Sequence, residues 1–195
     1  MAASGRMAPM IPGKISKPGA LEWLPAERLG QMSVDALLRP WLIGKGLLTQ
    51  RLKALCGARF SLRLVEQRTD LLDEAHQRGL GVQDGAGLFR EVEMCCDEHV
   101  WVFAETIMPD STLSAHPWLA ELGDSALGET LSDLSGLQRS SYEYAWLPAA
   151  DALCARALRA ADVKPPGLWA RRSKLSLRGA PVLVQELFLP AMGRI

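Results

Sequence analysis

A single carboxylate interrupts an apolar strand near the C-terminus, and this constrains the fold more than any other feature. The run Val182–Pro190 is almost entirely apolar but contains Glu186. Side chains of a strand alternate between its two faces, so Glu186 shares its face with Val182, Val184 and Phe188. A carboxylate on a buried face is desolvated, and it then needs a partner or a raised pKa. The rest of the chain must therefore supply a group for Glu186 to meet.

The residues around this run predict antiparallel hairpins. Apolar and polar residues alternate over 174–178, and Gly179-Ala180-Pro181 is typical of a turn into the strand that carries Glu186. A second hairpin is predicted from residues 88–96 and 100–108. Helical spacing is confined to insertions between the strands. The sequence therefore predicts an α+β fold built on a single antiparallel β-sheet.

Two helical hairpins are predicted outside the sheet. The first covers residues 34–42 and 47–55, and the second covers 117–122 and 127–134. A helix–turn–helix pair can bind DNA, but the cluster of basic residues that a recognition helix needs is missing here. We therefore interpret both pairs as structural insertions.

Length, composition and charge limit the classes of partner. The chain has 195 residues, with 22 Lys plus Arg and 22 Asp plus Glu, which argues against nucleic acid or an anionic membrane. No stretch approaches the roughly 20 apolar residues of a membrane span, and the N-terminus lacks a signal-peptide core, so we expect a cytoplasmic protein. Residues 1–20 contain several Gly and Pro and are expected to form a flexible tail before one domain over 21–195.

The cysteines and histidines do not predict a metal site. Cys56, Cys95, Cys96 and Cys154 have no CxxC spacing. Cys95 and Cys96 are adjacent on a predicted strand, so they point to opposite faces and cannot bind one metal together. We expect no metal and reduced thiols at all four positions.

Arg90 is the natural counterpart of Glu186. Alternation over residues 88–96 places Arg90 on a face with Leu88, Val92 and Met94. Its acidic neighbours Glu91 and Glu93 fall on the opposite face, which has the more polar composition. Two strands thus each place one charge, of opposite sign, on an apolar face.

Two interpretations of this pair stay open from periodicity alone. In the first, Arg90 and Glu186 form a salt bridge in the core, although burial often cancels the Coulomb gain of such a pair. In the second, the two charges bracket a small polar ligand, with the arginine binding a carboxylate and the glutamate accepting a hydroxyl hydrogen bond or a proton. Arg171 and Arg172 could likewise bind an anion, or one could be solvated while the other pairs with an acid. Glu105 is left unassigned.

Several segments resemble chorismate pyruvate-lyases. The C-terminal block is the most specific. The matching segments are Trp169–Leu177, Gly179–Pro181, Val184–Pro190, Leu88–Val92, Met108–Leu113, Leu127–Gly128 and, more loosely, Trp41–Leu52. They occur in the family's order and cover most of the chain after about residue 35. Two departures are Leu48, where the family has methionine, and Ala170, where it has glycine.

The resemblance implies a fold, an activity and a set of partners. The fold is an antiparallel sheet with two helical hairpin flaps over an internal ligand cavity. The activity is removal of pyruvate from chorismate to give 4-hydroxybenzoate, a precursor of ubiquinone, with no metal or organic cofactor. The expected partners are this substrate and product, and by analogy the protein is expected to be a monomer.

The resemblance also assigns the site residue by residue. Arg90 takes the place of the arginine that binds the ligand carboxylate, and Glu186 that of the buried glutamate at the ring hydroxyl. Leu48 and Leu127 are implied to hold the carboxylate through main-chain NH groups. These assignments make Arg90 and Glu186 the catalytic pair, with Glu186 as either proton acceptor or hydroxyl anchor.

A second function is compatible with the same fold. The effector domains of some bacterial transcription regulators share it and sense small ligands without catalysis. Such domains normally follow a winged-helix domain, and residues 1–35 are too short for one and lack its basic helix. A purely structural domain would instead require Arg90 and Glu186 to pair with each other.

Overall fold

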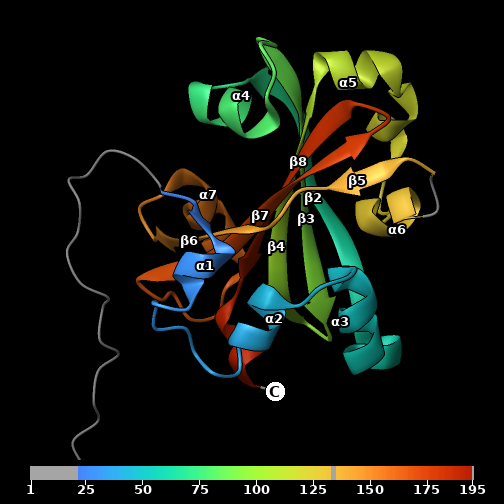
Figure 1. Ribbon diagram of the computed structural model, residues 1–195. Helices are drawn as coiled ribbons and strands as arrows, with labels where there is room; N and C mark the ends of the chain where they lie inside the picture. Colours follow the sequence, from blue (N-terminus) through green and yellow to red (C-terminus); the bar gives the residue numbers. More distant parts are fainter. Residues whose placement is uncertain (1–21, 133–134, 195) are drawn as a thin grey trace, which may run out of the picture.

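A computed structural model describes residues 22–132 and 135–194, so the expected tail and the end of the predicted 127–134 helix lie outside the described residues. Eight strands form one antiparallel sheet in the order β1-β6-β7-β8-β4-β3-β2, with β5 also paired to β7 (Figure 1). The strands are β1 (Leu24–Pro25), β2 (Phe60–Leu71), β3 (Ala86–Cys96), β4 (His99–Pro109), β5 (Leu137–Arg139), β6 (Glu143–Pro148), β7 (Gly167–Leu177) and β8 (Ala180–Phe188). The α+β prediction is confirmed.

Two tight turns set the register of the central strands. Arg178 and Gly179 both have positive φ, 51° and 92°, between β7 and β8. Positive φ at both central residues is the signature of a two-residue turn whose twist matches the flanking strands. Asp97 also has a positive φ, 54°, in the β3–β4 turn. The predicted turn at Gly179–Pro181 is therefore placed too late, because Ala180 and Pro181 already belong to β8.

The helices are short and lie on both faces of the sheet. They are α1 (Ala26–Leu29), α2 (Arg39–Ile43), α3 (Leu48–Cys56), α4 (Glu74–Leu80), α5 (Asp110–Ala115), α6 (Leu127–Ser132) and α7 (Ala152–Ala157), with 3-10 turns at Gly57–Arg59, Pro117–Glu121, Leu158–Ala160 and Pro190–Arg194. Pro40 does not bend the first predicted helix. It lies in the first turn of α2, where a missing NH costs nothing, so the helix begins there.

Each face of the sheet has its own core. On one face, Val92, Ala104 and Phe188 pack with residues of α2 and α3, while Leu88 and Met108 pack with Leu127 and Leu131 of α6. We call this the flap face. On the other face, Phe103 and Leu187 pack against α7, and Phe89 and Ile107 lie beside Leu80 of α4. The two predicted helical hairpins thus cover the same face, at neighbouring positions (Figure 1).

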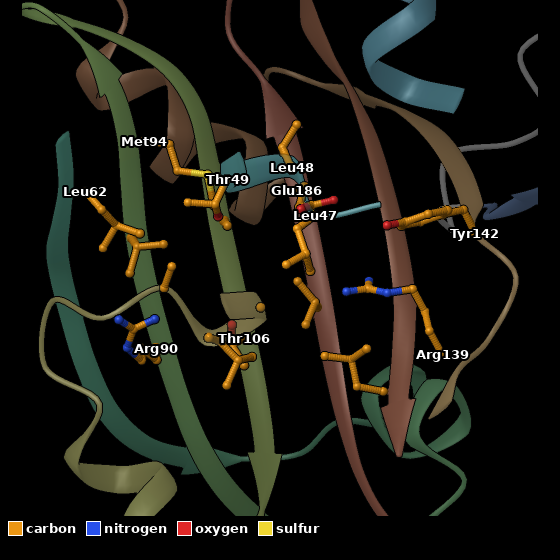
Figure 2. A pocket seen from close by; sticks show the side chains of 17 residues that line it. Leu47, Leu48, Thr49, Leu62, Arg90, Met94, Thr106, Arg139, Tyr142 and Glu186 are labelled. Carbon is orange, nitrogen blue, oxygen red and sulfur yellow. The ribbon is translucent and has the colours of Figure 1, made fainter. Parts of the chain in front are cut away.

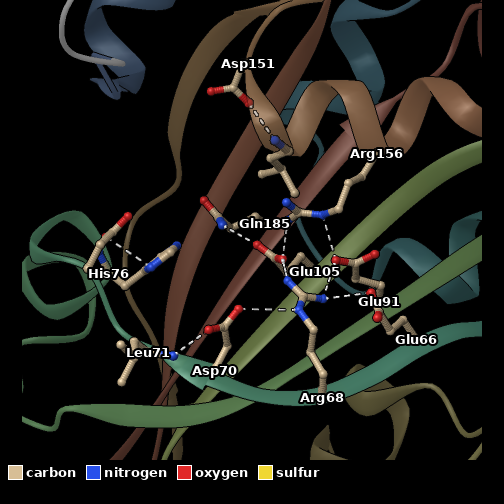
Figure 3. Close-up of polar contacts among 12 residues, drawn as sticks. Glu66, Arg68, Asp70, Leu71, His76, Glu91, Glu105, Asp151, Arg156 and Gln185 are labelled. Carbon is tan, nitrogen blue, oxygen red and sulfur yellow. Dashed lines mark hydrogen bonds and ion pairs between the residues drawn. The ribbon is translucent and has the colours of Figure 1, made fainter.

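The opposite face, expected to be polar, is buried and contains an ion-pair network (Figure 3). Glu91 and Glu105 are only 2% and 1% exposed. Arg156 of α7 lies 2.5 Å from Glu105 and 2.7 Å from Glu91, and Arg68 of β2 lies 2.8 Å from Glu91. Gln185 also donates a hydrogen bond to Glu105, at 3.1 Å. The acids of this face are therefore neutralised within the protein, away from the flap face.

Replacing Glu105 by glutamine is expected to change how stability depends on pH. Burial raises the pKa of Glu105 above its ordinary value of 4.5, against the opposing effect of Arg156. A carboxyl with a higher pKa in the folded state stabilises the fold most below pH 4.5, and this contribution is lost as the pH rises through the folded pKa. Glu105→Gln should remove this loss of stability. In urea unfolding, the free energy of unfolding of the variant should therefore rise relative to that of wild type as the pH increases above 4.5. A pH-independent difference would contradict this.

The cysteines correct one expectation. Cys56, at the end of α3, forms a disulfide with Cys96 at the end of β3, with Cα atoms 5.8 Å apart. The prediction of reduced thiols is therefore wrong for this pair, which ties the first flap to the sheet. Cys95 and Cys154 are buried free thiols, and burial raises the pKa of Cys154 to about 11. Within the described residues, no helix is long and apolar enough to cross a membrane.

Candidate active site

A pocket opens on the flap face between α3 and α6. It is narrow and partly open to solvent. Its floor is formed by β3, β4 and β8, and its cover by the starts of the two flap helices (Figure 2). Polar lining residues include Thr49, Arg90, Thr106, Arg139, Tyr142 and Glu186, and most of the others are aliphatic. Both charges predicted from the sequence therefore line one cavity.

Glu186 lies on β8 and meets Arg171 of the neighbouring strand β7. The two residues are directly paired in the sheet, and Arg171 Nε donates to Glu186 Oε2 at 2.5 Å. Arg171 is fully buried, and its Nη1 also donates to the carbonyls of Trp41, Leu42 and Gly44. Burial acts to lower the pKa of Arg171, but the adjacent Glu186, together with Tyr142 and Tyr144, outweighs burial and raises the pKa above the ordinary value. This ion pair links the pocket floor to the segment that leads into α3.

Arg90 lies on β3 and has no carboxylate partner among the described residues. It is 1% exposed, and its Nη2 donates to the carbonyls of Gly123 and Ser125 at 2.7 and 2.9 Å. Its buried Nε has no hydrogen-bond partner in the described structure. Burial lowers the pKa of Arg90, and only the more distant Asp124 opposes the shift. Arg90 is thus a buried cation without an anion beside it in the part of the chain that the structure describes.

The direct salt bridge between Arg90 and Glu186 is not formed. Arg171 occupies the position beside Glu186, and Arg90 lies on the far side of β4 from it. Neighbouring strands are about 4.8 Å apart, so one intervening strand separates the two backbones by roughly 10 Å. Among the described residues, Glu186 Oε1 accepts no hydrogen bond and is available to a ligand.

The main-chain positions expected from the resemblance lie at the starts of the flap helices. Leu48 and Leu127 are the first residues of α3 and α6, and both line the pocket. NH groups in the first turn of a helix have no acceptor within that helix. The residue before α3 makes no side-chain cap, so no side chain caps the first turn of α3 in the described structure. Both flaps therefore present backbone donors at the cavity that contains Arg90.

Contacts between the two flaps close the cover of the pocket. Lys53 of α3 pairs with Glu129 of α6 at 2.8 Å. A side chain at Gly128 would come within 3.3 Å of Leu47, so glycine permits the close approach of the two helices. The ion pair is partly exposed and so contributes little stability. The two flaps are thus in contact through the Lys53–Glu129 pair and through Gly128 beside Leu47.

Two pocket residues were not foreseen from the sequence. Residues 137–146 suggest one strand, but the structure has two, β5 and β6, with a break at 140–142. Tyr142 lies in this break, and its ring centroid is 4.4 Å from the Arg171 guanidinium carbon. Arg139 ends β5 and donates to Ser173 Oγ at 2.5 Å. Arg172 lies on the opposite face of β7 from Arg171 and pairs with Glu143. No local pattern marks the strand break that brings Arg139 and Tyr142 to the pocket.

A metal-dependent site is not indicated by the described residues. They contain no group of three or more His, Cys, Asp or Glu side chains that could hold a metal ion. The charged groups of the pocket are two arginines that form no ion pair with the described residues and one glutamate in an ion pair. This set suits an anionic organic ligand with a hydrogen-bonding group at its other end.

Comparison with solved structures identifies the fold. The effector domain of PhnF from Mycobacterium smegmatis matches with a TM-score of 0.53 and 21% identity, covering 75% of this chain and 90% of that one. A GntR-family transcriptional regulator from Bacillus cereus matches with a TM-score of 0.53 and 13% identity, covering 69% of this chain and 94% of that one. At these identities the likeness concerns the fold alone.

Comparison of sequences identifies the family. The family model described as chorismate lyase matches residues 18–194. A probable chorismate pyruvate-lyase of Pseudomonas aeruginosa is 36% identical, covering 87% of this chain and 92% of the relative. A chorismate pyruvate-lyase of Erwinia tasmaniensis is 32% identical, covering 88% of this chain and 87% of the relative. Since both comparisons span nearly the whole chain, it belongs to the chorismate lyase family.

Proposed function

We propose that this protein removes pyruvate from chorismate and releases 4-hydroxybenzoate, the aromatic precursor of ubiquinone. The observation that carries the proposal is Arg90, a buried guanidinium without a carboxylate partner in the described structure, in the same pocket as Glu186. A buried cation of this kind is stabilised when a ligand supplies the missing anion. Membership of the chorismate lyase family indicates chorismate as the ligand, and chorismate has a ring carboxylate and a ring hydroxyl that match Arg90 and Glu186.

The ligand groups fit the two ends of the pocket. The ring carboxylate of chorismate would meet the Arg90 guanidinium and the NH groups of Leu48 and Leu127. The ring hydroxyl lies para to this carboxylate and would donate to Glu186 Oε1, while Arg171 holds Oε2. The aliphatic lining residues would enclose the ring and exclude water. Arg171 would act as a positioning residue, because it touches Glu186 rather than the ligand.

The reaction then needs little beyond orientation. The bond between ring C3 and the enolpyruvyl oxygen breaks, the C4 proton leaves, and its electron pair forms the double bond that completes the aromatic ring. The enolate released takes up a proton on carbon to become pyruvate. Aromatisation supplies the driving force, so holding the substrate in a reactive geometry accounts for much of the catalysis. The flat product keeps both anchoring groups, so flap opening is expected to limit turnover.

Incubation with chorismate tests the proposal. The purified chain, without added metal, should form 4-hydroxybenzoate and pyruvate in equal amounts and faster than chorismate decomposes in buffer alone. The two products are measured separately, because pyruvate alone also arises from other breakdown of chorismate. Tight binding of 4-hydroxybenzoate without turnover would contradict the lyase proposal and favour a ligand-sensing role for this pocket.

Glu186→Gln separates the two roles open to Glu186. Glutamine keeps the shape, and with its amide oxygen accepting from Arg171 in place of Oε2 its NH2 can donate to the ring hydroxyl oxygen, but it cannot take up a proton at neutral pH. A fall in kcat of about 100-fold or more, with the affinity for 4-hydroxybenzoate retained, identifies Glu186 as the proton acceptor. An unchanged kcat with weakened binding identifies it as the hydroxyl anchor alone.

A further inference from the structure

Two guanidinium groups line the pocket without a carboxylate partner. Arg90 and Arg139 approach it from opposite sides, with Glu186 and Tyr142 on the side of Arg139 (Figure 2). No ion pair to either arginine is present among the described residues, whereas Arg171 is occupied by Glu186. The ring carboxylate of the proposed substrate accounts for Arg90 only. The second guanidinium is therefore free to bind a second anionic group.

The surroundings of Arg139 hold its guanidinium at the pocket rim. Arg139 pairs in the sheet with Leu175, which also lines the pocket, so its side chain is on the flap face. The buried hydroxyl of Ser173 accepts a hydrogen bond from Nη1, and the guanidinium carbon is 5.4 Å from the Tyr142 ring centroid. A guanidinium has five NH donors, and Ser173 uses one. Arg139 is also exposed, unlike Arg90.

We propose that Arg139 binds the carboxylate of the enolpyruvyl side chain of chorismate. This inference rests on the proposed function. Chorismate has two carboxylates, and the enolpyruvyl group is attached at ring C3, next to the C4 hydroxyl. A substrate anchored at Arg90 and Glu186 therefore directs its second carboxylate to the Glu186 side of the pocket. Ser173 pairs in the sheet with Val184, one step along the flap face from Glu186, and it brings the guanidinium of Arg139 to that level.

This assignment separates substrate binding from product binding. The carboxylate at Arg139 leaves with pyruvate, whereas the carboxylate at Arg90 stays on 4-hydroxybenzoate. Arg139 thus contributes to the affinity for chorismate and for the departing pyruvate, but not to the retention of the aromatic product. Its exposed position suits a group whose ligand must leave toward solvent while the ring is still enclosed.

Arg139→Gln tests the proposal by comparing its effect on KM for chorismate with its effect on the Kd of 4-hydroxybenzoate. A charge-assisted hydrogen bond at an exposed site is weakened by solvent, so we expect KM for chorismate to rise about 10-fold, the equivalent of about 1.4 kcal/mol. The Kd of 4-hydroxybenzoate should stay within about twofold of wild type, because the product has no group at Arg139. Arg139→Lys keeps the positive charge but loses the paired NH donors of the guanidinium, so its KM for chorismate should lie between the values of wild type and Arg139→Gln. Inhibition by added pyruvate should weaken in Arg139→Gln.

Arg159→Gln is the matched control. It removes one exposed positive charge from the 3-10 turn after α7, over the opposite face of the sheet, and should leave KM and Kd unchanged. An unchanged KM in Arg139→Gln, or an equal rise in KM and in the Kd of 4-hydroxybenzoate, overturns the assignment while wild-type turnover still stands. Absence of wild-type turnover would instead overturn the proposed function, and this inference with it.

Discussion

Replacing Arg171 by methionine is expected to lower the free energy of unfolding by about 3–5 kcal/mol. The change leaves the Glu186 carboxylate, 7% exposed, without its cation. It also removes the donor to three carbonyls of the segment before α3, which positions the first flap. Equilibrium urea unfolding of wild type and variant measures the difference. Binding of 4-hydroxybenzoate should weaken as well, because both Glu186 and the flap lose their support.

Arg172→Met is the matched control for this prediction. Arg172 is the next residue along β7 and forms its ion pair with Glu143, whose side chain is 44% exposed. Partly exposed pairs contribute about 0–1 kcal/mol, so the loss should be several times smaller than for Arg171→Met. The double variant Arg171→Met/Glu186→Leu removes both buried charges and should regain part of the lost stability. Equal losses at positions 171 and 172 would show that the buried pair is not what stabilises this region.

Replacing Arg90 by methionine is expected to affect binding far more than stability. Arg90 has no carboxylate partner in the described structure, so its removal leaves no buried anion behind. We expect a change of about 1 kcal/mol in unfolding free energy, mainly from the unpaired carbonyls of Gly123 and Ser125. The affinity for 4-hydroxybenzoate should fall by about 10- to 150-fold, the equivalent of a hydrogen bond to a charged group.

Titration calorimetry with 4-hydroxybenzoate and thermal unfolding with and without it measure the two effects of Arg90→Met separately. The stabilisation of wild type by the ligand should be largely lost in the variant. Arg159→Met, on the opposite face, is the control and should bind like wild type. An affinity for 4-hydroxybenzoate that survives in Arg90→Met would remove the basis for the proposed carboxylate site.

Arg171 rather than Arg90 pairs with Glu186 because of the register between β7 and β8. A turn at Gly179–Pro181, as the sequence suggests, would set Glu186 opposite Lys174. The observed turn at Arg178–Gly179 sets it opposite Arg171 instead. Arg178 adopts a positive φ that non-glycine residues seldom take, so an arginine at this position does not predict a turn. The identity of the partner of Glu186 depended on this shift.

The face that carries Glu91 and Glu105 shows a similar limit. Alternation correctly assigns Glu91 to the face opposite Arg90, but the polar composition of that face suggests contact with solvent, and Glu105 is left unassigned. Arg156 of α7 and Arg68 of β2, distant in sequence, cover and neutralise both acids instead. Periodicity tells which residues share a face, whereas burial depends on what packs over it.

The sequence by itself determined the antiparallel α+β class, the two helical insertions, an apolar strand face for each of Arg90 and Glu186, and a resemblance that the family comparison confirms. These follow from local periodicity and from motifs continuous in the chain. Only the tertiary structure decided that Arg171 pairs with Glu186, that Arg90 lacks an anion among the described residues, and that Arg139 reaches the pocket. Each of these depends on register, on a strand break or on packing between distant segments, and such long-range contacts leave no local pattern in the sequence.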